Sequence, residues 1–142
     1  WSVEDVLEAF LRSPAFDMLL PSVVRENPDT PYLRHAFQPE TLKKEDFRSY
    51  SKAQIEDYLG QHASTWDSAE DRADFLALLE AYLPFHHAVP EACAFFVLSL
   101  DWFDQGDYRL KEPESWCYTS YFLILWIDPK TSILSASLWT YD

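Results

Sequence analysis

Two adjacent histidines and two cysteines are the residues of this chain best suited to metal binding or nucleophilic catalysis. His86 and His87 are neighbours, so they lie on different faces of any regular element and lack the i, i+4 spacing of a helical zinc pair. A metal site would need distant ligands such as Cys93 or Asp101. Cys93 and Cys117 match neither a zinc-finger spacing nor a redox pair. We interpret the histidines as polar loop residues and the cysteines as free buried thiols, and we expect no metal and no cofactor.

Three aspartates, Asp101, Asp104 and Asp107, are separated by turn residues, an arrangement that can surround a calcium ion. Their spacing differs from that of the EF-hand loop, so we interpret the segment as a solvated turn. Neither cysteine stands in a motif with a histidine, and no Gly-x-Ser-x-Gly elbow is present. Among 24 acids, some pairs of carboxylates could lie at the separation that glycoside hydrolysis requires once the chain is folded. The sequence alone identifies no such pair. We predict that the protein is not an enzyme.

The segment 101–116 combines carboxylates with large aromatic side chains, a composition that suits recognition of a basic protein. Acids steer and orient a cationic partner, while tryptophan and tyrosine are common interface anchors. The alternative is that the aromatic side chains point inward and only the acids face water. The predicted partner-binding surface consists of Asp101, Trp102, Asp104, Asp107, Tyr108, Glu112, Glu114 and Trp116.

A second acidic cluster stands at the expected start of a helix. Acids at this position complement the helix dipole, which already accounts for their presence. We therefore rank the cluster as a secondary candidate for partner binding. It consists of Asp67, Glu70, Asp71 and Asp74.

The chain of 142 residues has 24 Asp and Glu against 11 Lys and Arg, a formal charge of -13. Residues 53–142 hold 15 acids and 4 bases, which is -11, whereas residues 1–52 hold 9 acids and 7 bases, which is -2. Such an acidic chain repels phosphate, which argues against nucleic acid and anionic membranes as partners. With only 2 glycines, a glycine-rich phosphate loop is excluded. The excess charge serves either solubility or a cationic partner.

Capping signals and apolar spacing predict about four helices in the first part of the chain. The first spans 2–11 and the second starts at Ser13-Pro14. A third helical region covers about 42–62, either continuous or broken near Ser51, where a capping box stands. The fourth starts after Ser68 and is expected to end at Pro84. Its predicted buried stripe consists of Phe75, Leu76, Leu79, Tyr82 and Leu83.

After Pro90 the pattern changes to that of strands. Runs of aromatic and branched residues predict strands at 92–100 and 118–127. The turn Asp128-Pro129-Lys130-Thr131 follows, and a third strand at 132–141 pairs back to form a hairpin. A tighter turn at 104–107 precedes a short strand at 108–110. The predicted fold is α+β, with about four N-terminal helices packed on one face of a C-terminal, mostly antiparallel β-meander of about four strands. Residues 1–142 form a single domain.

Size, charge and the acidic-aromatic segment together favour a non-catalytic acidic binding protein that neutralises a basic protein by occluding its surface. The most familiar examples of this class are immunity and antitoxin proteins, which inhibit a cationic toxin or nuclease. The alternative is a small-molecule-binding or hydrolytic α+β domain with an aromatic-lined pocket. The residues that would line this pocket are Tyr121, Trp126, Trp139 and His86.

The chain contains no run of about 18 apolar residues and no visible signal peptide, so we expect a cytoplasmic protein without membrane association. Because the first residue is Trp1, a removed leader or a truncation stays open. The redox state of the two cysteines and the choice between monomer and homodimer also stay open.

Overall fold

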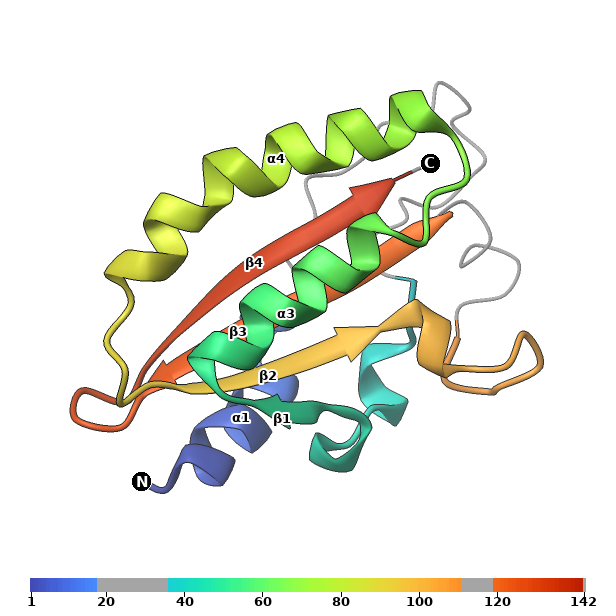
Figure 1. The fold of residues 1–142 in the computed structure, drawn as a ribbon. Coiled ribbons are helices and arrows are strands. Elements are labelled where there is room, and N and C mark those ends of the chain that lie inside the picture. Colours follow the sequence, from blue (N-terminus) through green and yellow to red (C-terminus); the bar gives the residue numbers. More distant parts are fainter. Residues whose placement is uncertain (18–35, 111–118, 142) are drawn as a thin grey trace.

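The computed structural model describes residues 1–17, 36–110 and 119–141 of the chain. Within these ranges a four-stranded antiparallel sheet is flanked by helices, which confirms the α+β class (Figure 1). The helices are α1 (Val3–Leu11), α2 (Pro14–Asp17), α3 (Lys52–Ala63) and α4 (Ala69–Ala88). The strands are β1 (Arg48–Tyr50), β2 (Ala94–Ser99), β3 (Ser120–Asp128) and β4 (Ile133–Tyr141). Short 3-10 turns are η1 (Pro39–Thr41), η2 (Lys44–Asp46) and η3 (Leu100–Trp102).

The sheet is a meander whose strand order, β1-β2-β3-β4, follows the sequence. Successive residues of β3 enter two separate hydrophobic cores, because side chains alternate between the faces of a sheet. Leu123 is buried in a core with Leu7 of α1. Phe122 is buried in the other core with Ile55 of α3 and Leu79 of α4. The helices are therefore divided between the faces: α3 and α4 share one, and α1 covers the opposite one rather than joining them as the sequence predicted.

The hairpin formed by β3 and β4 is confirmed. Nine consecutive residue pairs run from Ser120 with Tyr141 to Asp128 with Ile133. The side chain of Asp128 accepts a hydrogen bond from the backbone N–H of Lys130 at 2.8 Å, as its place at the start of the turn predicts. Ser132 adopts a left-handed conformation with φ of 56°. The turn is therefore one residue longer than the four residues predicted, and β4 begins at Ile133.

The helix predicted over 42–62 is wrong in its first half. Residues 44–46 form a 3-10 turn, and Arg48–Tyr50 pair with β2 as an edge strand. The helix begins only after Ser51, where the predicted capping box with Gln54 is confirmed. The short strand predicted at 108–110 is also wrong, because its last residue, Leu110, forms only an isolated bridge with Phe37. The sheet still has four strands, because β1 takes the place of the strand predicted at 108–110.

The predicted end of the fourth helix at Pro84 is wrong, because α4 continues to Ala88. The last turn is fixed by contacts with α3. The buried His86 donates from Nε2 to the backbone oxygen of Lys52 at 2.9 Å. The Nζ atom of Lys52 donates in return to the backbone oxygens of His87 and Val89, at 2.9 and 2.7 Å. The two histidines are therefore helical residues and not loop residues. Leu76, predicted on the buried stripe, is 46% exposed.

Two tyrosines packed into the core beneath α3 and α4 should make the protein sensitive to alkali. Burial raises the pKa of Tyr58 and of Tyr82 to about 12. An unfolded tyrosine ionises near pH 10, so this contribution to stability is complete below about pH 10 and is lost as the pH rises toward 12. We expect the free energy of unfolding, measured by urea titration, to fall between about pH 10 and about pH 12. Tyr58→Phe and Tyr82→Phe should each flatten this decline, and an unchanged slope in both variants would contradict the assignment.

Candidate binding site

The segment 101–108 presents fewer aromatic side chains to solvent than its composition suggests. Trp102 is half-buried against the core beneath α3, with the guanidinium of Arg48 over its ring, 3.9 Å from the centroid. Phe103 packs on Phe37 at the α1 face, with ring centroids 5.0 Å apart. Tyr108 is 66% exposed, and Asp101 and Asp104 are also exposed. Three members of the predicted surface lie outside the described residues: Glu112, Glu114 and Trp116.

Asp107 is held by an intramolecular ion pair. The Nε and Nη2 atoms of Arg109 donate to its two carboxylate oxygens at 2.9 and 2.6 Å, and Nη1 of the same residue donates to Asp46. These hydrogen bonds hold the pKa of Asp107 below its ordinary value. Arg109 thus joins the turn at 104–107 to η2. The Asp107 carboxylate has its cation within the chain, so its role is to shape the turn.

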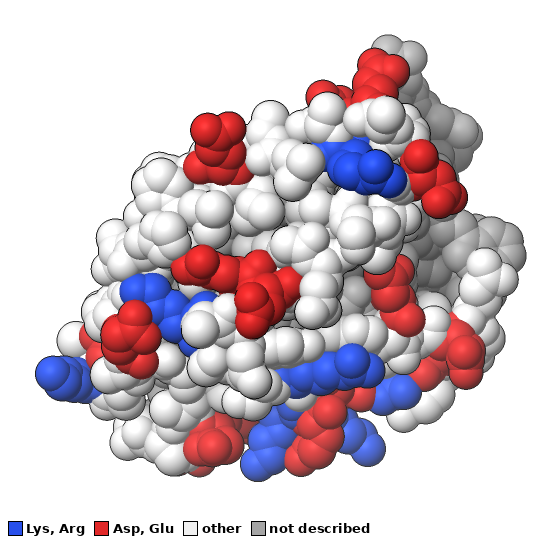
Figure 2. Space-filling model, viewed as in Figure 1, with Lys and Arg blue, Asp and Glu red and all other residues white. Residues whose placement is uncertain are grey.

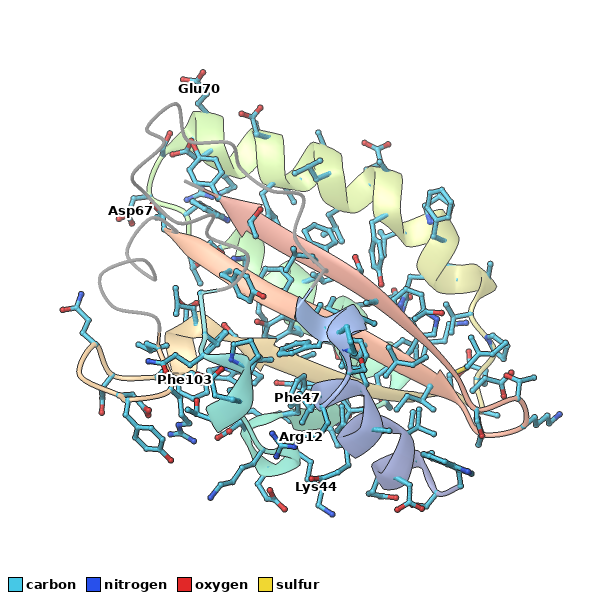
Figure 3. All side chains as sticks on the ribbon, turned by 180° about the vertical axis from the view of Figure 1, so that it is seen from behind. Arg12, Lys44, Phe47, Asp67, Glu70 and Phe103 are labelled. Carbon is cyan, nitrogen blue, oxygen red and sulfur yellow. The ribbon has the colours of Figure 1, made fainter. Side chains whose placement is uncertain are left out.

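The second acidic cluster lies at the first turns of α4, as predicted. The Ser68 hydroxyl accepts a hydrogen bond from the backbone N–H of Asp71 at 3.3 Å, which confirms the helix cap. The side chain of Asp71 accepts a hydrogen bond from the Tyr141 hydroxyl, which raises the pKa of this tyrosine. Figure 3 shows Asp67 and Glu70 at this end of the molecule.

Positive charge is concentrated elsewhere. Figure 3 shows Arg12 and Lys44 beside α1, far from the start of α4. Figure 2 shows, from the opposite side, several Lys and Arg side chains along the lower edge with Asp and Glu among them, and scattered charged side chains on the mostly uncharged surface above. Arg12 and Lys44, from the less acidic part of the sequence, thus lie apart from the acidic cluster at the start of α4.

The fold brings together acids from both predicted clusters. Asp67 and Asp71 from the start of α4 and Asp101 from η3 line one hollow of about 570 Å³ with Trp66 and Tyr141. We call it the acidic hollow. Within the described chain none of these three carboxylates lies in ion-pair contact with a Lys or Arg side chain. The sequence analysis kept the two clusters apart, and tertiary structure joins them.

A buried histidine forms part of the wall of the acidic hollow. His62 is 8% exposed, and its Nε2 atom lies 3.2 Å from the hydroxyl oxygen of Ser120. Burial lowers the pKa of His62, against the opposing effect of Asp101. The imidazole is therefore neutral at pH 7 and adds no positive charge to a hollow lined by carboxylates.

A second hollow, of about 610 Å³, adjoins the first and lies between α4 and β4. We call it the α4/β4 groove. Its walls are mainly apolar, and Asp71 and Asp74 stand at one end. It shares Trp66, Asp71, Ser120 and Tyr141 with the acidic hollow. The residues lining the groove are Trp66, Asp71, Asp74, Phe75, Leu78, Ala81, Tyr82, Phe85, Ser120, Phe122 and Ser137–Tyr141.

The aromatic pocket of the alternative prediction is formed by other residues than expected. Of its four proposed lining residues only Trp139 lines the α4/β4 groove. Tyr121 belongs to the core on the α1 face, His86 is buried against α3, and Trp126 packs on Phe95. A local signal for the residues that were missed exists in the sequence: Trp66 directly precedes Asp67, which repeats the aromatic-acid pairing seen at 101–108.

The groove walls contain hydrogen-bond donors without acceptors. The indole N–H groups of Trp66 and Trp139 and the hydroxyl of Tyr82 are buried and have no partner within the described chain. An unsatisfied buried donor costs about 1–3 kcal/mol, so native proteins hold few of them. The three groups come from three parts of the α4/β4 groove: the loop before α4, α4 itself and β4.

Metal and thiol chemistry receive no geometric support from the described parts of the chain. No group of three or more His, Cys, Asp or Glu side chains is arranged there to hold a metal ion. Cys93 is a free buried thiol whose pKa is raised by burial. Cys117 lies outside the described residues. None of the helices within the described ranges is long and apolar enough to cross a membrane.

The fold and site define an α+β domain with an acidic hollow that opens into an apolar groove. No known family model matches the chain, and no curated protein or solved structure shows significant similarity to it. Its function must therefore be inferred from the chemistry of these two hollows.

Proposed function

We propose that this protein is a non-catalytic acidic binding protein that neutralises a basic protein partner by covering its cationic surface. The partner class we favour is a cationic toxin or nuclease, which makes the protein an inhibitor of the immunity or antitoxin type, acting in the cytoplasm. The strongest support is the convergence of Asp67, Asp71 and Asp101 on one hollow beside two aromatic side chains. A hollow with uncompensated carboxylates attracts Lys and Arg side chains.

Blockade requires no chemistry beyond this contact. Basic side chains that hold phosphates in a nuclease would instead meet carboxylates, and the nuclease would lose its substrate site. The Tyr141 hydroxyl holds the Asp71 side chain in place before binding, which reduces the entropy lost on association. Trp66 and Tyr141 supply the aromatic contact that usually dominates such interfaces. Asp104 and the exposed Tyr108 do not line the hollow, and we keep them as further members of the proposed binding surface.

The alternative function, a small-molecule-binding or hydrolytic domain, draws support from the size of the α4/β4 groove. Its volume of about 610 Å³ falls within the range of ligand pockets, which is about 300–1,000 Å³. The described residues that line it include the carboxylates of Asp71 and Asp74 but no histidine, cysteine or lysine, and the Asp71 side chain already accepts a hydrogen bond from Tyr141. Ligand binding therefore remains the competing proposal, and hydrolysis ranks below it.

Two matched double variants test the proposed function. Asp67→Lys with Asp101→Lys reverses two charges in the acidic hollow, while Asp57→Lys with Glu80→Lys makes the same change in net charge at exposed positions outside both hollows. We expect the wild-type protein, used as bait in an extract of its native host, to capture a basic protein and to inhibit the activity of that protein. The first variant should bind this partner about 100-fold more weakly, and the second within about threefold of wild type.

Salt dependence and a nonspecific polycation complete the test. The association rate with the captured partner should drop steeply with salt, since the screening length falls from about 10 Å at 0.1 M to about 3 Å at 1 M. Polylysine, which has no specific shape, should bind both double variants equally. Capture of no basic protein, equal loss in the two variants, or association that ignores salt would each rule out the proposal.

A further inference from the structure

The free edge of β4 lacks the protection that sheet edges usually have. β4 is the last strand of the sheet, is nine residues long and pairs only with β3 within the described chain. Natural edge strands are commonly short, charged, bulged or interrupted by proline, because unpaired backbone groups recruit other strands. β4 contains no charged residue and no proline, and its register with β3 has no bulge. The opposite edge strand, β1, has only three residues and includes Arg48.

The α4/β4 groove follows this free edge. Five consecutive residues of β4, Ser137–Tyr141, line it. Leu138 belongs to the α1 face of the sheet and Trp139 to the α4 face, so a hollow that reaches both lies along the edge and not over one face. Figure 1 shows α4 running alongside β4. An extended segment placed in the groove would therefore meet the unpaired backbone of β4.

The opposite wall of the groove is a bare apolar surface on α4. Leu78 is 61% exposed and Phe85 is 74% exposed, although both are large apolar side chains. Both line the groove, on the side of the helix that faces away from the core residue Leu79. Exposed apolar side chains that border a hollow are typical of an interaction surface.

The charge of the residues that line the α4/β4 groove indicates which kind of protein segment would bind there. Asp71 and Asp74 line one end of the groove, and the acidic hollow continues from that end. Within the described chain no Lys or Arg lines the groove. A second copy of this chain fits poorly, because neither its β4 nor its own groove lining supplies a base to meet these aspartates. A segment whose apolar side chains lie along the groove and whose basic side chains lie at the end beside Asp71 and Asp74 is complementary to both features.

We infer that the α4/β4 groove binds an extended apolar-basic segment of the partner protein, which adds to β4 as a fifth strand of the sheet. Its apolar side chains pack against Leu78, Phe85 and Trp139, while its Lys or Arg side chains reach Asp71 and Asp74. The backbone of this segment supplies the N–H and carbonyl groups that the unpaired edge of β4 can bind. The inference rests on the proposed function in one respect, which is that the partner is basic.

Synthetic peptides test the inference without knowledge of the partner. The first probe is a nine-residue capped peptide of alternating valine and threonine that ends in three lysines, the second ends in three glutamates instead, and the third is the lysine peptide with a central proline. Binding to the full chain is followed by tryptophan fluorescence, because Trp66 and Trp139 line the groove. We expect the lysine peptide to bind at least about tenfold more tightly than either of the others. Amide hydrogen exchange should slow in residues 133–141.

Two substitutions on α4 provide the matched control. Leu78→Lys places a charge in the groove, whereas Leu76→Lys makes the same change at a position that is 46% exposed and does not line the groove. The first should weaken binding of the lysine peptide at least about tenfold and the second no more than about twofold. Absence of binding, equal binding of the glutamate peptide, equal effects of the two substitutions, or protection outside β4 would overturn the inference. A concentration-dependent dimer that Leu78→Lys abolishes would overturn it in favour of a second copy.

The two proposals fail in distinguishable ways. If a captured partner depends on Asp67 and Asp101 but tolerates Leu78→Lys, the proposed function stands and the strand-addition inference fails. If the lysine peptide binds along β4 as described but no inhibited basic protein is captured, the groove is a peptide site and the proposed function fails.

Discussion

Replacing Phe122 by alanine is expected to lower the free energy of unfolding by about 3–5 kcal/mol, because the substitution leaves a large cavity in the core. Phe122 is 1% exposed and joins three elements. Its ring centroid lies 5.5 Å from Tyr58 and 4.8 Å from His62 on α3. It stacks on Trp139 of β4 at 5.5 Å. A domain of this size has a total stability of about 5–15 kcal/mol, so this one change removes a large part of it.

Urea unfolding followed by circular dichroism measures this loss. Phe85→Ala is the matched control, because it removes the same side chain at a position that is 74% exposed. It should change the free energy of unfolding by no more than about 0.5 kcal/mol. A loss below about 1 kcal/mol for Phe122→Ala would contradict the view that α3, β3 and β4 share one packed core.

The parts of the fold with strong local signals were predictable. The capping boxes at Ser2 and Ser51 and the cap at Ser68 fix the starts of three helices by hydrogen bonds between residues three apart. The turn that begins at Asp128 fixes the hairpin in the same way. Each of these signals acts within a few residues, so the sequence alone carries it.

Other elements depend on distant parts of the chain and have no local signal. β1 has only three residues, Arg48–Tyr50, and is a strand because the edge of β2 pairs with it. Apolar spacing shows that α1 has a buried face but not which side of the sheet it covers. A clue existed in β3, whose uninterrupted apolar run requires cover on both faces and therefore a helix on each side.

The candidate site was predictable only in its parts. Asp101 is separated from Asp67 by more than thirty residues, and no spacing rule connects them. The acids at the start of α4 also have a sufficient explanation as helix-capping residues, which concealed their second role in the acidic hollow. The free edge of β4 follows from its place as the last strand of the sheet. Composition thus identified the residue types of the site, and tertiary structure was needed to join them.

Pro84→Ala is expected to raise the free energy of unfolding by about 1–3 kcal/mol, because a proline within a helix costs about 3 kcal/mol. Pro84 has no N–H to donate to the backbone oxygen of Glu80, and its ring crowds that carbonyl. The helix continues because His86 and Lys52 hold its last turn. Pro84 itself is exposed, so alanine loses no packing. The greater freedom of the unfolded alanine chain offsets the gain by about 1 kcal/mol.

The reverse substitution in the same helix is the control. Ala77 is exposed and lies within α4, so Ala77→Pro should lower the free energy of unfolding by about 3 kcal/mol. Both variants are compared with wild type by urea unfolding, and the two changes should have opposite signs. If Pro84→Ala lowered stability instead, the restricted backbone of proline would be stabilising the last turn of α4. The contacts of His86 with α3 would then depend on this restriction, whereas we expect the hydrogen bonds to Lys52 to hold the turn without it.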